Sequence, residues 1–168
     1  MGRVVSMSME HEFYQVSLKA IIRRPDGKVL CLKGKKGGAF EGYHDLPGGR
    51  ISKKEFRVSF MEILQRELQE EIGDLSVDIS SIPCGVGRHL SKDGFPVIYI
   101  FFPATCTATN ASVPISHEHE GYAWLELTEG SAENFFISGI LEGVQQYLHQ
   151  LARPSNSLSD QGVDQRKF

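Results

Sequence analysis

The sequence predicts an α/β domain in which a mixed β-sheet lies between two helical layers. Two segments, residues 60–72 and residues 131–151, have apolar side chains at helical spacing. Shorter segments before and between them are rich in β-branched and aromatic residues, which favour strands. Two amphipathic helices can each bury an apolar face against one side of a single sheet, and this arrangement is the expected fold.

A β-hairpin is expected near the start of the chain, over residues 13–33. Residues 13–22 are rich in β-branched and aromatic residues, a Pro-Asp-Gly turn follows at residues 25–27, and residues 29–33 can form the returning strand. The next segment, residues 34–42, is rich in glycine, which disfavours both helix and strand. We therefore expect a loop after the hairpin.

Four extended segments are expected after the first helix: a short edge strand over residues 75–79, an extended segment over 82–90, a central strand over 97–107 and a final strand over 118–127. The third is an unbroken apolar and β-branched run, which is typical of a strand covered on both faces. A second helix is expected over residues 131–151, although Gly139 and Gly143 disfavour a helix in its middle.

The length of 168 residues and an ordinary balance of apolar and charged residues suit one domain with a single core. We expect residues 12–152 to form this domain, after an N-terminal extension of residues 1–11. Residues 153–168, in which Pro, Ser, Asn, Asp and Gln predominate, are predicted to be a disordered tail.

The composition disfavours several classes of partner. The formal net charge of −3 and the lack of a long basic cluster argue against a nucleic-acid polymer. No apolar run approaches the roughly 20 residues of a membrane span. Cys31, Cys84 and Cys106 lack CxxC spacing, so neither a disulfide framework nor a zinc site is expected, and the cytoplasm is the simplest location. The sequence leaves the oligomeric state open.

Three glutamates are expected to share one face of the first helix. Glu67, Glu70 and Glu71 stand at positions i, i+3 and i+4, which are neighbours on a helix surface. Their charges repel one another unless a base, water or a cation lies among them. Carboxylate oxygens are ligands that Mg²⁺ and Mn²⁺ prefer. The face therefore has the donor set of a site for Mg²⁺ (or Mn²⁺).

The residues around this helix resemble a known family signature. Leu-Pro-Gly-Gly at residues 46–49, Glu55, and Arg-Glu-Leu-Gln-Glu-Glu-Ile-Gly at residues 66–73 are similar to the Nudix box. This box marks hydrolases that cleave nucleoside diphosphates linked to another moiety. The resemblance implies a Nudix-type α/β/α sandwich with a mixed sheet between helices, and it extends in outline over residues 12–150.

The resemblance also implies roles for individual residues. It assigns metal binding to Glu67, Glu70 and Glu71. Glu70 is also expected to be catalytic. Arg66 is expected to support catalysis by reaching Glu62 or by orienting Glu55. Gly48 and Gly49 are expected to let the backbone turn tightly beneath the metal site.

The spacing of the box departs from the Nudix pattern in one place. Ten residues separate Glu55 from Arg66 where the pattern has seven, and Asp74 takes a position that the family fills with an aliphatic residue. Within a helix, three extra residues would rotate Glu55 by most of a turn, whereas the preceding loop would absorb them. We favour the loop, because residues 57–59 carry no apolar stripe leading back to Glu55.

The general base is expected in the loop before the last strand. Glu120 is the first candidate and Glu118 the second, because related enzymes often take an extra ligand or base from this region. His117 and His119 have a suitable intrinsic pKa of about 6.5, but two exposed loop histidines fit the sequence equally well.

The expected activity is attack of an activated water on phosphorus, with a small nucleotide as partner, either a nucleoside triphosphate or a nucleotide derivative. Two alternatives stay open. The insertion and Asp74 would also fit a catalytically weak or inactive Nudix-fold module that binds nucleotides or has a regulatory role. A related isopentenyl diphosphate isomerase would need a catalytic cysteine, and neither Cys31 nor Cys84 has a supporting motif.

Overall fold

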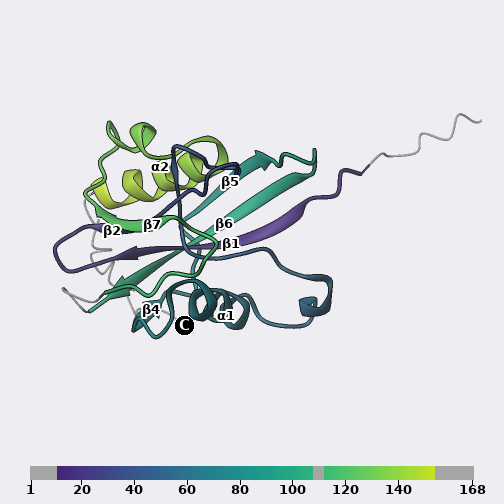
Figure 1. Cartoon of the computed structure of the whole chain (residues 1–168), viewed down its shortest axis with the longest axis horizontal. Coiled ribbons are helices and arrows are strands. Elements are labelled where there is room, and N and C mark those ends of the chain that lie inside the picture. Colours follow the sequence, from purple (N-terminus) through teal and green to yellow (C-terminus); the bar gives the residue numbers. More distant parts are fainter. Residues whose placement is uncertain (1–10, 108–111, 154–168) are drawn as a thin grey trace, which may run out of the picture.

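The computed structural model describes residues 11–107 and 112–153 (Figure 1). Within these residues, one seven-stranded sheet lies between helices α1 (Phe60–Ile72) and α2 (Ser138–Ala152). The strands are β1 (Gln15–Arg23), β2 (Val29–Lys33), β3 (His44–Asp45), β4 (Val77–Ile79), β5 (Gly85–Leu90), β6 (Pro96–Cys106) and β7 (Gly121–Leu125). Two short 3₁₀ helices are η1 (Lys53–Glu55) and η2 (Ala132–Asn134). The predicted N-terminal extension and C-terminal tail lie outside the described residues, apart from His11 and Arg153.

The sheet is mixed, as predicted. Strands β3, β2, β1, β6 and β4 are neighbours in that order, while β7 pairs with β2 and β5 pairs with β6. β1 and β6 run parallel, and the other pairs are antiparallel. The predicted hairpin is present, with β1 and β2 paired where Arg23 faces Val29. β6 lies between β1 on one side and β4 and β5 on the other, so the prediction of a central strand is confirmed.

Each helix covers a core of its own. Along β1, Leu18, Ala20 and Ile22 join the core on the α1 side, whereas Ile21 joins the core on the α2 side. The helices complete these cores with four buried residues each: Ile63, Leu64, Leu68 and Ile72 from α1, and Ile140, Val144, Tyr147 and Leu148 from α2. The single core expected from the composition is therefore divided in two by the sheet, because both faces of the sheet are apolar.

Helix α1 begins and ends where the sequence predicts. The hydroxyl of Ser59 accepts the N–H of Glu62 at 3.3 Å, and the Glu62 carboxylate accepts the N–H of Ser59 at 3.1 Å. Gly73 ends the helix with a φ of 63°, which glycine adopts at low cost. Residues 56–59 lie outside any helix, between η1 and α1. The extra residues of the box are thus in the loop, as predicted.

Helix α2 begins at Ser138, so the prediction of a helix from residue 131 is wrong over its first seven residues. The carbonyl of Phe135 accepts the N–H of His44 at 2.8 Å, and the side chain of Phe136 is fully buried. These tertiary contacts override the helical spacing of the two phenylalanines. In the part of the chain that the structure describes, no helix is long and apolar enough to cross a bilayer.

Two glycines let α2 pack closely on the sheet. A Cβ at Gly143 would overlap the ring of Phe101 on β6, and a Cβ at Gly139 would overlap the backbone of Arg88 on β5. The two glycines that disfavour helix formation are therefore the ones that seat the helix.

Side chains of α2 also bind the backbone of β5 along the edge that faces away from β6. Gln146 accepts the N–H of Val86 at 3.1 Å and donates to the Val86 carbonyl at 2.7 Å. One turn earlier, Glu142 accepts the N–H of Arg88 at 3.0 Å. These bonds tie α2 to the edge of β5.

Candidate active site

The three glutamates on the predicted face of α1 differ in environment. The side chains of Glu67 and Glu71 are 15% and 9% exposed, whereas that of Glu70 is 60% exposed. Burial raises the pKa of Glu67, and the hydrogen bond from Arg66 opposes this rise. The face therefore has two inner carboxylates and one outer carboxylate.

Glu71 joins the loop before α1 to the loop before β7. One of its carboxylate oxygens accepts the N–H of Gly48 at 2.6 Å, and the other lies 3.2 Å from Nε2 of His119. The Glu71 carbonyl accepts the N–H of Ser116 at 2.9 Å. Two segments far apart in the sequence thus meet at one carboxylate, and His119 is part of the site rather than an exposed loop residue.

Gly48 and Gly49 bring the backbone close to these carboxylates. Gly48 has a φ of 127°, and a Cβ there would overlap the carbonyl oxygen of Leu18. A Cβ on Gly49 would overlap the carboxylate of Glu67. The tight turn expected from the sequence is present, and a side chain at either position would displace β1 or Glu67.

Arg66 binds three carboxylates at once. Its guanidinium lies 2.7 Å from Glu55, 2.7 Å from Glu67 and 3.2 Å from Glu70. Arg66 was expected to reach either Glu62 or Glu55, and in the structure it binds Glu55. The Glu62 carboxylate instead accepts the N–H of Ser59 at the start of α1. Burial lowers the pKa of Arg66, but the hydrogen bonds to the glutamates outweigh burial and raise it. The insertion therefore leaves the contact between Glu55 and Arg66 intact.

A buried lysine, which we did not single out from the sequence, holds the loop that carries Gly48. Lys19 on β1 donates to the carboxylate of Asp45 at 2.8 Å and to the carbonyls of Leu46 at 2.9 Å and Gly48 at 3.0 Å. Burial lowers the pKa of Lys19, but Asp45 and Glu71 outweigh burial and raise it. The sequence feature that could have indicated the ion pair of Lys19 with Asp45 is a single lysine within an otherwise apolar strand.

A cleft with a cavity volume of about 290 Å³ lies beside these groups. Its lining includes Lys19, the Gly48–Gly49 turn and the side chains of Glu67 and Glu71. Glu118 also lines the cleft. Both Glu118 and Glu120 are exposed, but the first candidate base, Glu120, does not line the cleft, and its carboxylate accepts the N–H of Lys36 at 2.7 Å.

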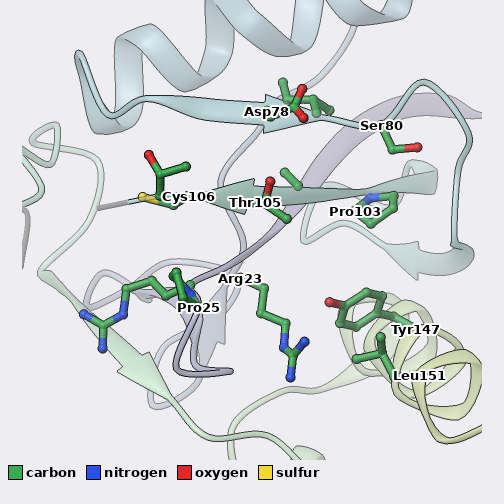
Figure 2. Close-up of a pocket in the computed structure, with 13 residues that line it drawn as sticks. Arg23, Pro25, Asp78, Ser80, Pro103, Thr105, Cys106, Tyr147 and Leu151 are labelled. Atoms are coloured by element: carbon green, nitrogen blue, oxygen red, sulfur yellow. The ribbon is translucent and has the colours of Figure 1, made fainter. Parts of the chain in front are cut away.

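A second cavity, of about 600 Å³, lies at the other end of β1 and β6 (Figure 2). Figure 2 shows Arg23, Asp78 and Tyr147 around it, from β1, β4 and α2 respectively. Among the described residues that line it, Asp78 is the only carboxylate, and none belongs to the box. Of these two cavities, only the first is lined by glutamates of the box, Glu67 and Glu71.

The chemistry of the donor set fits a hard divalent cation, but Arg66 engages the carboxylates. Within residues 11–107 and 112–153, no group of three or more Asp, Glu, His or Cys side chains is gathered to hold a metal ion as the side chains stand. Glu67 and Glu70 bind Arg66 instead. Carboxylates on neighbouring helix turns are ligands that Mg²⁺ and Mn²⁺ take, so a cation on this face would compete with the guanidinium.

Comparison with known proteins places the chain in a family. A family model described as the NUDIX domain matches residues 13–139. The chain belongs to the Nudix family. The match spans the whole sheet, α1 and the first residues of α2, so it includes both the box and the fold around it. No curated protein sequence matches the chain.

Solved structures share this Nudix fold. The MutT protein from Methanosarcina mazei Go1 is 23% identical, with a TM-score of 0.61, and the match covers 84% of this chain and 94% of that chain. The E. coli dihydroneopterin triphosphate pyrophosphohydrolase is 17% identical, with a TM-score of 0.57 and coverage of 83% and 97%. The NUDIX domain of Shewanella oneidensis NrtR, complexed with ADP ribose, is 16% identical, with a TM-score of 0.60 and coverage of 84% and 90%. At these identities the likeness shows the fold.

Proposed function

We propose that this Nudix domain hydrolyses the phosphoanhydride bond of a nucleoside diphosphate linked to another moiety, such as a nucleoside triphosphate. The observation that carries the proposal is the meeting of Glu67, Glu71 and the Gly48–Gly49 turn at one cleft. A small concave site lined mainly by charged and polar residues suits the phosphate chain of a small nucleotide rather than a polymer. The intact contact between Arg66 and Glu55 supports an active site despite the insertion.

The metal ligands in this proposal are Glu67, Glu70 and Glu71, which would hold Mg²⁺ or Mn²⁺. Such an ion, when bound, neutralises phosphate oxygens and lowers the pKa of a bound water. The residues of the chain prepare this face. The N–H of Gly48 orients the Glu71 carboxylate, and Arg66 offsets the repulsion between Glu67 and Glu70.

We place the general base at Glu118. Glu118 lines the cleft, where its carboxylate would accept a proton from the attacking water. Glu120 would first have to release the N–H of Lys36, and Nε2 of His119 is already at the Glu71 carboxylate. The catalytic role of Glu120 stays a prediction from the sequence.

Release of phosphate and pyrophosphate tests the proposal. The substrates to be assayed, each with and without Mg²⁺, are a panel of nucleoside triphosphates, nucleotide sugars, ADP-ribose and dinucleoside polyphosphates. We expect metal-dependent release from one class, and a loss of about 100-fold or more in Glu70→Gln and Glu67→Gln, since each removes charge from the metal site. Glu133→Gln, which changes an exposed carboxylate on η2, is the matched control. Unchanged turnover in Glu70→Gln would refute the ligand assignment.

A nucleotide-binding or regulatory module is the second candidate. The ion pairs of Arg66 with Glu67 and Glu70 favour it, because the guanidinium binds two of the carboxylates that a cation would need. The NUDIX domain of NrtR was solved with ADP ribose, so a Nudix domain can bind such a nucleotide. Nucleotide binding by the folded wild type, without release anywhere in the panel, would favour this candidate over the hydrolase.

A further inference from the structure

A third cavity, of about 760 Å³, is lined by the start of β1, by the segment that leads into α1 and by the first residues of α1. Its volume is within the roughly 300–1,000 Å³ that is usual for small-molecule sites. Aliphatic and phenylalanine residues make up half of its lining: Val16, Ile51, Phe56, Val58, Phe60 and Ile63. We call this cavity the apolar groove.

The apolar groove leaves large apolar side chains in contact with water. Phe56 is 88% exposed, and Tyr14, Val58 and Phe60, which also line the groove, are exposed as well. Exposed apolar surface that is gathered in one place marks a site for a ligand or a partner. Phe56 and Val58 lie between Glu55 and Arg66, where this chain has three residues more than the Nudix pattern. The lengthened stretch thus provides one wall of the groove.

The charged residues of the apolar groove favour an anion. Arg50 and Lys53 line it, and their side chains take part in no hydrogen bond or ion pair within the part of the chain that the structure describes. Among the described residues that line the groove, Glu55 is the only carboxylate, and Arg66 lies 2.7 Å from it. Unpaired cations beside apolar surface suit a ligand that carries both an apolar group and negative charge.

The apolar groove adjoins the cleft at Arg50, which lines both cavities. The residues on either side of Arg50 divide between the two, because Gly49 lines the cleft and Ile51 lines the groove. The same division occurs on β1, where Ser17, which pairs with Arg50, lines the cleft and Val16 lines the groove. A ligand with its phosphate chain in the cleft could therefore extend into the groove past Arg50.

The charge of Arg50 also acts on the cleft. Burial raises the pKa of Tyr99, which lines the cleft, and the positive charges of Lys19 and Arg50 oppose this rise. The same positive charges attract a phosphate chain. Lys19 already donates to three oxygens of the protein, so Arg50 is the cation that is available to a ligand.

We infer that the apolar groove takes the group that is linked to the diphosphate, and that this group is large and apolar rather than a sugar or a second nucleoside. The phosphate chain lies in the cleft, Arg50 binds it where it leaves the cleft, and the apolar group covers Phe56 and Val58. Burial of such a group removes apolar surface of both the ligand and the groove from water. A sugar would lose hydrogen bonds with water against these walls. The inference rests on the proposed function, because it assumes that the cleft takes a diphosphate.

Equilibrium binding of two matched ligands measures the preference without turnover. The ligands are the β-methyl and β-decyl esters of α,β-methylene-ADP, titrated with Mg²⁺ present and below the concentration at which the decyl ester forms micelles. We expect the decyl ester to bind at least about 100-fold more tightly. Each buried methylene contributes roughly fourfold, and ordering of the alkyl chain offsets part of this gain.

Three variants locate the preference on the protein. Phe56→Ser/Val58→Ser changes two exposed residues and should bring the ratio of the two affinities below about tenfold, with the methyl ester bound as by the wild type. Ile82→Ser changes an exposed apolar residue outside both cavities and should keep the wild-type ratio. Arg50→Gln should weaken the binding of both esters about tenfold and keep their ratio. A wild-type ratio in Phe56→Ser/Val58→Ser would overturn the inference.

A second copy of the chain is the alternative occupant of the apolar groove, and sedimentation velocity tests it. A wild-type dimer that dissociates in Phe56→Ser/Val58→Ser, together with equal binding of the two esters, would assign the groove to a second copy and overturn the inference. The same oligomeric state in both proteins supports the inference, because the groove is then open to a ligand.

Hydrolysis of the β-decyl ester of ADP separates this inference from the proposed function. Attack of water on either phosphorus breaks the anhydride bond and gives AMP and decyl phosphate. Preference for the decyl ester, without AMP formation and without release in the panel, would refute the hydrolase and support the apolar groove as a ligand site. Hydrolysis in the panel with equal binding of the two esters would support the hydrolase and overturn the inference. A lack of binding of either ester would overturn it as well.

Discussion

Replacing Lys19 by methionine tests whether a buried ion pair holds the loop of the active site. Lys19 is 4% exposed, and its ammonium donates to Asp45, Leu46 and Gly48. Methionine keeps most of the aliphatic part of the lysine side chain, but it removes the ammonium and leaves the Asp45 carboxylate buried without its partner. Removing one member of a buried ion pair costs about 3–5 kcal/mol. That is a large share of the roughly 5–15 kcal/mol by which domains are stable.

Urea unfolding at pH 7, followed by circular dichroism and by the fluorescence of Trp124, measures this loss. The pKa of Lys19 is raised, so its contribution is fully present below 10.5 and is lost only as the pH rises through the folded-state pKa. Lys54→Met, at an exposed lysine, should stay within about 0.5 kcal/mol of the wild type.

The double variant Lys19→Met/Asp45→Leu removes both charges and should recover most of the lost free energy of unfolding. A loss below about 1 kcal/mol in Lys19→Met would refute the reasoning, because a surface ion pair already contributes that much.

Three further experiments test other parts of the structure. Gly87→Ala should lower the free energy of unfolding by about 1–3 kcal/mol, because the new Cβ would overlap the backbone of α2, whereas Gly130→Ala has open space; thermal unfolding compares them. Glu118→Gln should lower kcat by about 100-fold or more, and Glu120→Gln much less, in the release assay. The hydrogen bond from the cap serine lowers the pKa of Glu62 below 4.5. The wild type should therefore be more stable than Glu62→Gln above that pH, and thermal unfolding should show this advantage disappear as the pH falls through the lowered value.

Local signals in the sequence were sufficient to predict α1 but not the start of α2. The apolar spacing of α1 lies within the helix itself, and the glycine that ends it follows directly, so its extent could be predicted. Phe135 and Phe136 also have helical spacing, but the chain there is held by His44 and by the core on the α2 side. Contacts with distant residues decided that segment, and no local pattern contains them.

In the candidate site, too, local sequence patterns predict some residues, whereas contacts between distant segments decide others. The shared face of Glu67 and Glu71 follows from helical geometry, so it could be predicted from spacing alone. The choice between Glu118 and Glu120 could not, because it depends on where the loop before β7 meets Lys36 and the cleft. Their order along the chain carries no information about which of the two residues lines the cleft.

The binding of α2 side chains along β5 has a consequence for aggregation. An open edge strand offers its N–H and carbonyl groups to any extended chain, and sheets grow from one molecule to the next by such pairing. At β5 the groups of Val86 are already bound by Gln146, and the N–H of Arg88 is bound by Glu142. An incoming strand would have to detach a helix that is anchored in the core. This edge of the sheet therefore resists growth into fibrils for as long as α2 stays docked.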